Sequence, residues 1–402
     1  MRKYISFGYF DKKYFIIFII FLITTFIEYF LLFYNDKITN YRTKIRTNKL
    51  LLPTLAYIGQ FLCFIPLIIS KKYNNKKSST KNYKSSIEIK YIFNNSGNLI
   101  TFKNIILIII ICILLLINNI ISLLSSHLIK IGKILFNQTF YFIDYLLLFL
   151  ISKFIFKLNY YKHQYYSIAF IILFGLLKYL IKLFTERNLN YNYKEVILVL
   201  MLQIIHAFID SYSTGNIKIL MEYKYLSPYF ISSIIGIING LIAIICYFIA
   251  TYFPCNNDFC ELIYNNKRYF DNIYSIFDDI YPTEIFLYIY TIFQSGIYQI
   301  LIYITINDFT VCHIFLFYQI IEFADTLVEI FITNKNIFAI CIVITSGIFE
   351  IFIVLVFLEI IELGFCGLNY NTKRNIKERA LNDSKLLNEI RTPTEESVMI
   401  DE

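Results

Sequence analysis

Apolar residues along this chain come in long blocks that are separated by shorter polar stretches. Each block is about 20 residues long or longer, which is the length that an α-helix needs to cross the hydrocarbon core of a bilayer. The pattern therefore predicts an all-α polytopic membrane protein with ten transmembrane helices. The predicted spans are residues 14–34, 50–70, 104–124, 134–156, 165–184, 194–213, 228–253, 284–306, 311–332 and 337–363.

Proline and glycine positions refine these spans. Pro228 and Pro282 fall at span starts, where the missing N–H costs little. Pro66 lies inside the second span and predicts a kink there. Gly236 and Gly240 lie four residues apart in the seventh span and predict that this helix approaches a neighbour closely.

Polar stretches divide the chain further. Residues 1–13 form an N-terminal tail, residues 71–103 a flexible loop rich in Lys, Asn and Ser, and residues 364–402 a polar C-terminal tail. Lys and Arg gather on the side of the two tails, so the positive-inside rule predicts cytosolic termini and a lumenal loop at 254–283. Residues 35–49 disagree with this orientation, because they carry five basic residues on the predicted outer side.

Composition narrows the class of protein. The chain is 57% hydrophobic and 16% charged, whereas soluble proteins carry about 25% charged residues. The net charge of +8 does not indicate a nucleic-acid partner, because the basic residues lie between apolar blocks rather than in one cluster. Cys255 and Cys260 form a close pair in the predicted lumenal loop and are a candidate disulfide if that side is oxidising. No other Cys or His lies near them in the sequence, so we expect no metal site, and we expect no cofactor.

Ionisable side chains inside the apolar blocks are the main functional signal, because such groups are costly in a bilayer and usually face protein or water. The stretch YQIIEFADTLVEIF (318–331) places Glu322, Asp325 and Glu329 on one helix face. The other candidate residues inside spans are Glu28, Asp144, Gln203, His206 and Asp210.

Each of these residues also has a structural interpretation. His206 and Asp210, one helical turn apart, are equally expected as a buried hydrogen-bonded pair. Glu329, and more strongly Glu359 and Glu362 near the end of the last span, are expected to extend to the membrane surface. The remaining candidates with two interpretations are Lys178 and Lys182, which either pair with acids or reach the headgroups.

The polar residues recur with a period of five spans. Spans one and six, and spans four and nine, carry comparable polar faces. We therefore predict a 5+5 inverted repeat, with residues 14–184 and 185–363 as its two halves. An odd number of helices per half gives the halves opposite orientations, as in many secondary transporters with a site at the midplane.

Two stretches resemble the drug/metabolite transporter superfamily, and within it solute carrier family 35 and its chloroquine-resistance-transporter-like relatives. FNQTFYFIDYLLLFLISKFIFKLNYYKHQYYSIAFIILFGLLKYLI (136–181) is similar to the family's span four, basic hinge and span five. VLMLQIIHAFIDSYSTGNIKILMEYKYLSPYFISSIIGIINGLIAII (199–245) is similar to its span six, a loop ending in Ser-Pro, and span seven. The chain departs from the family in having only 12 Gly. The resemblance implies transport of a small organic solute, more often in endomembranes than at the plasma membrane.

We therefore expect a secondary-active transporter rather than an enzyme, acting as a monomer or homodimer in a vacuolar, lysosomal or Golgi membrane. No P-loop motif is present, so ATP hydrolysis at a P-loop is excluded as the energy source for transport. An acidic cavity favours a cationic or polar solute, and crowded carboxyls suit proton coupling. The expected cavity residues are Glu28, Asp144, Gln203, His206, Asp210, Glu322 and Asp325.

Three alternatives remain from the sequence. A nucleotide-sugar transporter of the same superfamily needs cations in the cavity, and Lys178 and Lys182 are the candidates. A polytopic enzyme needs a nucleophile or metal set, yet the chain has neither H-E-x-x-H nor G-x-S-x-G, so we expect no catalytic residues. A receptor or scaffold is the third.

Overall fold

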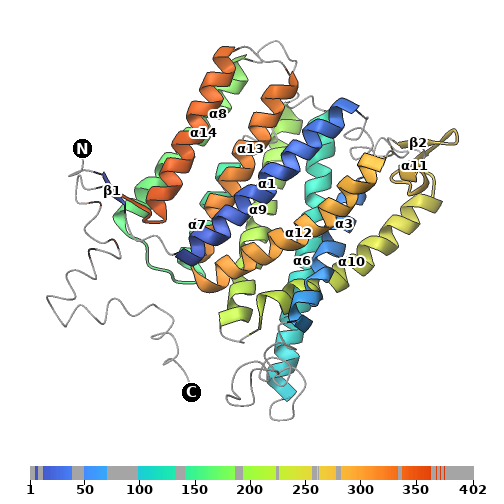
Figure 1. Ribbon diagram of the computed structural model, residues 1–402, viewed down its shortest axis with the longest axis horizontal. Coiled ribbons are helices and arrows are strands. Elements are labelled where there is room, and N and C mark those ends of the chain that lie inside the picture. Colours follow the sequence, from blue (N-terminus) through green and yellow to red (C-terminus); the bar gives the residue numbers. More distant parts are fainter. Residues whose placement is uncertain are drawn as a thin grey trace. The chain divides into compact units, whose positions relative to one another are not determined.

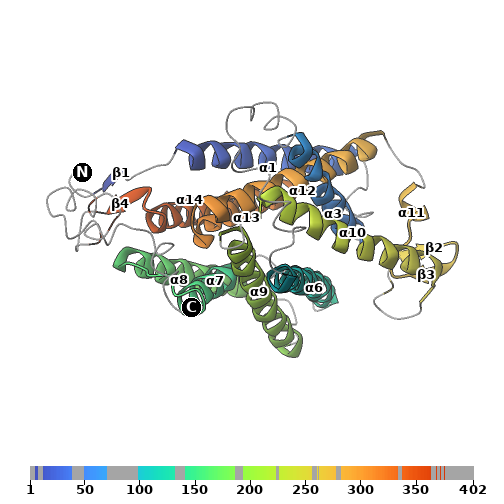
Figure 2. The same cartoon turned by 90° about the horizontal axis from the view of Figure 1, so that it is seen from below.

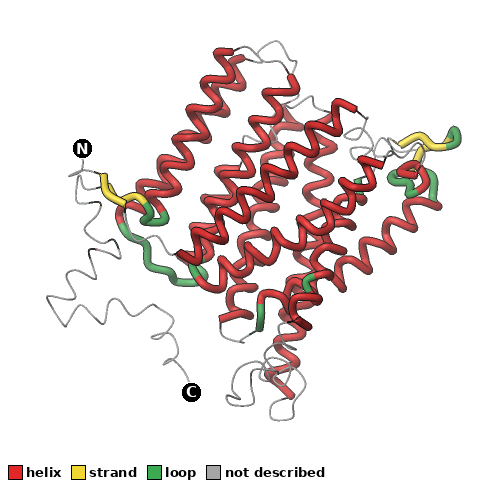
Figure 3. Tube along the Cα trace, viewed as in Figure 1, coloured by secondary structure: helices red, strands yellow, loops and turns green. Residues whose placement is uncertain are grey.

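The computed structural model describes most of the hydrophobic part of the chain, and almost all of that part is helical (Figures 1 and 3). The predicted C-terminal tail beyond residue 375 and most of the predicted loop 71–103 lie outside the described residues. The described residues are 5–7, 12–38, 49–69, 98–131, 141–185, 193–222, 226–255, 260, 262–277, 282–333, 337–363, 368, 372 and 375.

The described helices fall on the ten predicted apolar segments. They are α1 (Lys12–Ile38), α3 (Leu51–Leu62), α6 (Asn98–Ile131), α7 (Tyr141–Phe154), α8 (Lys162–Thr185), α9 (Tyr193–Glu222), α10 (Pro228–Tyr252), α12 (Pro282–Asp308), α13 (Phe315–Thr333) and α14 (Ile337–Phe357). The shorter elements are the strands β1 (Ile5–Phe7), β2 (Leu262–Tyr264), β3 (Lys267–Tyr269) and β4 (Ile361–Leu363), the helix α11 (Tyr274–Phe277) and the 3₁₀ turn η2 (Val311–Ile314).

Several of these helices are able to cross a membrane. In the part of the chain that the structure describes, five are long and apolar enough: Leu51–Ile69, Asn104–Ser125, Ile197–Met221, Pro228–Tyr252 and Glu284–Asp308. Large apolar side chains such as Ile245 and Phe248 are exposed on their outer faces, which suits contact with lipid. The architecture is compatible with an integral membrane protein.

The helix at residues 51–69 is broken one turn before Pro66, as predicted. α3 ends at Leu62, Cys63 forms a turn, and the helix resumes over residues 64–69. Proline has no N–H to donate to the carbonyl four residues earlier, and its ring clashes with that carbonyl. At the break the N–H of Cys63 donates instead to the Gln60 carbonyl at 3.1 Å.

The last predicted span, 337–363, is too long. α14 ends at Phe357, and β4 pairs antiparallel with β1, with Ile5 opposite Leu363. The helix ends because Glu359 takes a left-handed conformation (φ 61°) and the N–H of Ile360 donates to the Leu355 carbonyl at 2.9 Å. This arrangement satisfies carbonyls that a helix end otherwise leaves without donors.

Contacts divide the chain into two compact units, each of which is described here by itself. Unit 1 comprises Met1–Ile19, Phe136–Asn190 and Cys312–Glu402, and unit 2 comprises Ile20–Leu135 and Tyr191–Val311. Each predicted five-helix repeat contributes to both units. The units are therefore a different division of the chain from the predicted repeats.

In unit 1 the helices form two pairs. α7 packs with α8, α13 packs with α14, and α8 lies along α14, where the rings of Phe174 and Phe349 stack with centroids 5.8 Å apart (Figures 1 and 2). α13 and α14 approach closely because Gly347 has no side chain: a Cβ there would lie within 3.0 Å of the Phe323 ring.

In unit 2, α3 packs against both α10 and α12, and α6 packs against α9. Gly236 of α10 lies directly on the backbone of α3, so that a Cβ there would come within 3.0 Å of the Phe61 nitrogen. The predicted close approach of the seventh span is thereby confirmed. Gly240, one turn later, leaves more room, because its Cβ would lie 3.4 Å from the Tyr57 Cβ.

These two glycines make a matched pair for mutation. We expect Gly236→Ala to destabilise the protein by about 1–3 kcal/mol, because backbone atoms of α3 must move to admit the methyl group. Gly240→Ala should be neutral or stabilising, since the methyl group fits and alanine favours the helix. Melting temperatures in one detergent measure both. Equal melting temperatures for the two variants would contradict the close packing of α10 on α3.

Candidate functional site

The polar face of α9 lies in unit 2 and carries Gln203, His206 and Asp210, three of the predicted site residues. His206 is half-buried and interacts electrostatically with Asp210, one turn further along the helix. The Nδ1 atom of His206 is buried and makes no hydrogen bond within the described residues. A buried nitrogen of this kind is able to accept a ligand or water as its partner.

Two tyrosines extend this face towards α3 and α6. Tyr303 of α12 is buried and lies within electrostatic range of both Asp210 and Tyr57. Asn119 of α6 donates a hydrogen bond to the Tyr57 hydroxyl, and the fully buried Asn239 of α10 also lies beside Tyr57. We call the residues of this chain of contacts the central polar cluster, and they are His206, Asp210, Tyr303, Tyr57, Asn119 and Asn239.

Glu28 lies in unit 2 but is held by a different helix. Its Oε2 atom accepts a hydrogen bond of 2.7 Å from the Gln294 side chain of α12. One turn earlier, the Tyr290 hydroxyl donates to the Thr24 carbonyl at 3.0 Å. These bonds fix α1 against α12 and show how one predicted site residue is positioned.

The acidic stretch of α13 lies in unit 1, where a line of hydrogen bonds crosses three helices. The Tyr145 hydroxyl of α7 donates to Gln319 Oε1 at 3.1 Å, and Gln319 Nε2 donates to Glu350 Oε2 of α14 at 2.8 Å. Glu322, almost one turn after Gln319, is buried as well. Glu350, which is not among the predicted site residues, is the carboxylate at the end of this line of hydrogen bonds.

The remaining predicted residues are placed as follows. Asp144 is half-buried in the first turn of α7. The side chains of Asp325, Glu329, Lys178 and Lys182 lie outside the described residues. Glu322 belongs to unit 1 and His206 to unit 2, so the predicted cavity between them joins two separately described units and stays a prediction.

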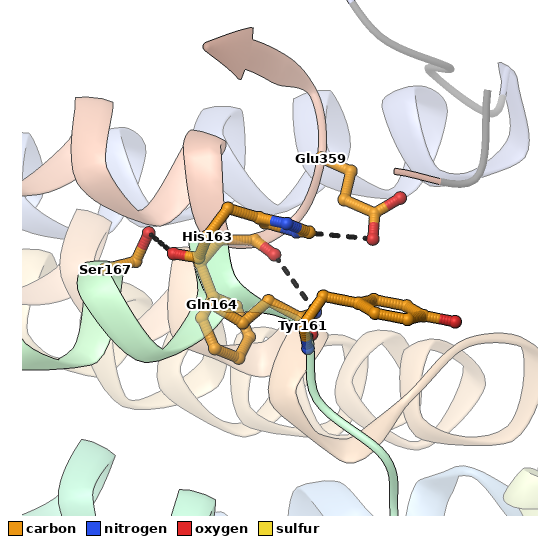
Figure 4. Close-up of polar contacts among 6 residues, drawn as sticks. Tyr161, His163, Gln164, Ser167 and Glu359 are labelled. Atoms are coloured by element: carbon orange, nitrogen blue, oxygen red, sulfur yellow. Dashed lines mark hydrogen bonds and ion pairs between the residues drawn. The ribbon is translucent and has the colours of Figure 1, made fainter. Parts of the chain in front are cut away.

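Glu359 and Glu362 do not extend to the surface, contrary to expectation. Both are buried, and Glu359 Oε1 lies 3.3 Å from His163 Nε2 at the start of α8 (Figure 4). Figure 4 also shows the Ser167 hydroxyl donating to the His163 carbonyl, at 2.8 Å. The tight turn after α14 directs Glu359 to this histidine, which the spacing of the sequence does not reveal.

The loop between α10 and α12 is anchored to the start of α3. Cys255 and Cys260 are joined in a disulfide, and the Cys255 N–H donates to the Arg268 carbonyl of the β2–β3 hairpin at 2.9 Å. Asp271 is fully buried and accepts a hydrogen bond of 2.5 Å from the Leu50 N–H. Burial raises the pKa of Asp271 from 3.8 to about 7. The backbone N–H groups of Leu50 and Asn272, the charge of Lys49 and the Tyr247 side chain oppose this rise.

This buried carboxyl predicts a pH dependence of stability. Because the pKa is higher in the folded state, the folded protein holds the proton more tightly than the unfolded chain between pH 3.8 and about 7. The contribution of Asp271 is therefore greatest below pH 3.8, and it falls by about 4 kcal/mol as the pH rises to about 7. Asp271→Asn should remove this slope from melting temperatures measured against pH. The exposed Asp308→Asn should follow the wild type, and an unchanged slope in Asp271→Asn would contradict the assignment.

No group of three or more His, Cys, Asp or Glu side chains capable of holding a metal ion occurs among the described residues. The central polar cluster instead offers a carboxylate, an imidazole, two phenols and two amides. Such a set is suited to hydrogen bonding with a polar or cationic molecule.

No protein-family model matches the chain, and no curated protein matches it. Membership of the drug/metabolite transporter superfamily therefore stays a prediction from the stretches 136–181 and 199–245. The described part of the chain is mostly helical, with several helices able to cross a membrane and with polar groups buried between them.

Proposed function

We propose that this chain is a secondary-active transporter that moves a small organic solute across a membrane by alternating access. The observation that carries the proposal is the central polar cluster, which lies among helices apolar enough to cross a bilayer. Ionisable groups inside such helices are expensive and commonly mark a solute or ion path. If the positions of the central polar cluster served only helix packing, apolar residues would be sufficient there.

The chemistry of the cluster favours a cationic or polar solute. Asp210 supplies a carboxylate, and His206 and Tyr303 lie near it. Tyr57 adds a second phenol within electrostatic range of Tyr303. The nearest lysine along α9, Lys218, donates to the carbonyls of Ile306 and Phe309 at 3.1 and 2.7 Å. Lys218 therefore caps the end of α12 rather than supplying an anion site.

The packing within each unit supports the proposed 5+5 inverted repeat. α3 with α10, and α8 with α14, join spans five apart, as a two-fold relation requires. The pair α7–α8 has its equivalent in α13–α14. α6 also packs against α9, and the related helices α1 and α12 meet at Phe21 and Tyr298, whose ring centroids lie 5.1 Å apart.

Proton coupling is part of the proposal. Unit 1 has two buried carboxyls of its own, Glu322 on α13 and Glu350 on α14. In the proposed repeat, the helices equivalent to α13 and α14 do not carry the central polar cluster. Acidic side chains inside such helices commonly mark a proton path. We place the protein, as before, in an endomembrane of the vacuolar, lysosomal or Golgi type, with cytosolic termini.

A nucleotide-sugar transporter is the second candidate, and it requires that Lys178 and Lys182 of α8 supply the cations. A polytopic enzyme or scaffold requires no solute path.

We would measure the melting temperature of the purified protein against amino acids, peptides, polyamines, cationic drugs and nucleotide sugars at acid and neutral pH. A ligand that binds the folded state raises the melting temperature. We expect stabilisation by cationic or polar solutes. Stabilisation confined to nucleotide sugars would overturn the acidic-site assignment.

A further inference from the structure

A narrow apolar groove runs along the outside of unit 2 between α6 and α10. Its volume is about 430 Å³, and its walls are almost wholly apolar. α6 contributes Ile120 and Leu124, and α10 contributes Cys246 and Ile249. Ile120 is 64% exposed and Ile249 53% exposed, so the groove is open to the surroundings of the helices.

The end of the groove at the start of α3 has a different character. Lys49 and Phe270 line it there, and the Lys49 ammonium lies 5.3 Å from the centroid of the Phe270 ring. Among the described residues that line the groove, Lys49 is the one cation. It also lies close enough to the buried carboxyl of Asp271 to interact with its charge.

The position of this lysine relative to the bilayer follows from the helices. α3 begins and α10 ends at the loop that carries Phe270 and Asp271, which makes this end of both helices the membrane surface. A groove with apolar walls in the bilayer and an ammonium at its surface end has the amphipathic pattern of a phospholipid: acyl chain below, phosphate above.

We propose that this groove binds one anionic phospholipid, with an acyl chain along α6 and α10 and the phosphate on Lys49. The ammonium has three N–H donors, so it serves the phosphate and Asp271 together. α6 and α10 also carry Asn119 and Asn239 of the central polar cluster. A lipid that fixes the spacing of these helices therefore acts on the proposed solute site, although binding itself depends only on unit 2 lying in a bilayer.

The absence of Trp from the chain allows a direct test. Ile120→Trp places a single tryptophan in the groove, and Phe293→Trp places one on an exposed position of α12 that does not line it. Each full-length variant is reconstituted in phosphatidylcholine nanodiscs. Fluorescence is measured as brominated phosphatidylglycerol, or brominated phosphatidylcholine as the comparison, is added in steps.

We expect brominated phosphatidylglycerol to quench Ile120→Trp at about fivefold lower mole fraction than brominated phosphatidylcholine, the ratio that one surface lysine supports. Phe293→Trp should show no preference. Adding Lys49→Gln to Ile120→Trp should abolish the preference. Adding Asp271→Asn should strengthen it, because the competing carboxylate is gone. Equal quenching by the two lipids at Ile120→Trp, or a preference that survives Lys49→Gln, would overturn the proposal, and neither result bears on solute transport.

Discussion

Asp210→Asn is expected to lose binding of a cationic solute while the protein stays folded. Asp210 is the carboxylate of the central polar cluster and interacts with His206 on its own helix and with Tyr303 of α12. Removing the carboxylate that faces a cationic solute in a half-buried site costs about 2–5 kcal/mol of binding free energy. This corresponds to a dissociation constant at least about 30-fold weaker.

The measurement is the rise in melting temperature that a stabilising solute produces in wild type and variant. Asn has nearly the shape of Asp, so the melting temperature without solute should change little. Asp308→Asn, at the exposed end of α12, is the matched control and should respond like the wild type. If Asp210→Asn is stabilised by a cationic solute as strongly as the wild type, the solute binds elsewhere.

Separating His163 from Glu359 is expected to have the largest effect on stability. The two side chains are buried in unit 1, with Nε2 and Oε1 3.3 Å apart, and they join the start of α8 to the turn after α14. Removing one member of a buried ion pair leaves the other in surroundings that solvate it poorly. Such changes typically cost about 3–5 kcal/mol. Glu359→Ala and His163→Ala should each lower the melting temperature substantially.

A double-mutant cycle separates the pair from other effects. If the two side chains stabilise the fold through each other, the double variant should lose much less than the sum of the two single losses. Additive losses would show that burial of each residue, rather than the contact in Figure 4, accounts for the effect.

The sequence predicted the helices well because the signal is strong. Blocks of about 20 apolar residues favour helices in a bilayer. A described helix overlaps each block, and five of the described helices are long and apolar enough to cross a membrane. The break near Pro66 and the close approach at Gly236 also follow from local chemistry, the missing N–H and the missing Cβ. These features depend on neighbouring residues along one helix.

The candidate site was only partly predictable. His206 and Asp210 were found because charge is rare in apolar blocks, and the structure places them together. Tyr57 and Tyr303 carry no such signal in a chain with 35 Tyr. The contact of Glu359 with His163 depends on a turn and a three-residue strand that join distant parts of the chain. Tertiary packing, not spacing, selects these partners.

Transport itself is the central claim, and flux into sealed vesicles tests it most directly. The purified protein would be reconstituted in proteoliposomes, and uptake of the solute that most raises its melting temperature would be measured with and without a proton gradient. We expect uptake above that of empty vesicles, increased by the gradient and lost in Asp210→Asn. Binding without any uptake, in vesicles where the protein is inserted and folded, would contradict a transporter and favour a receptor or scaffold.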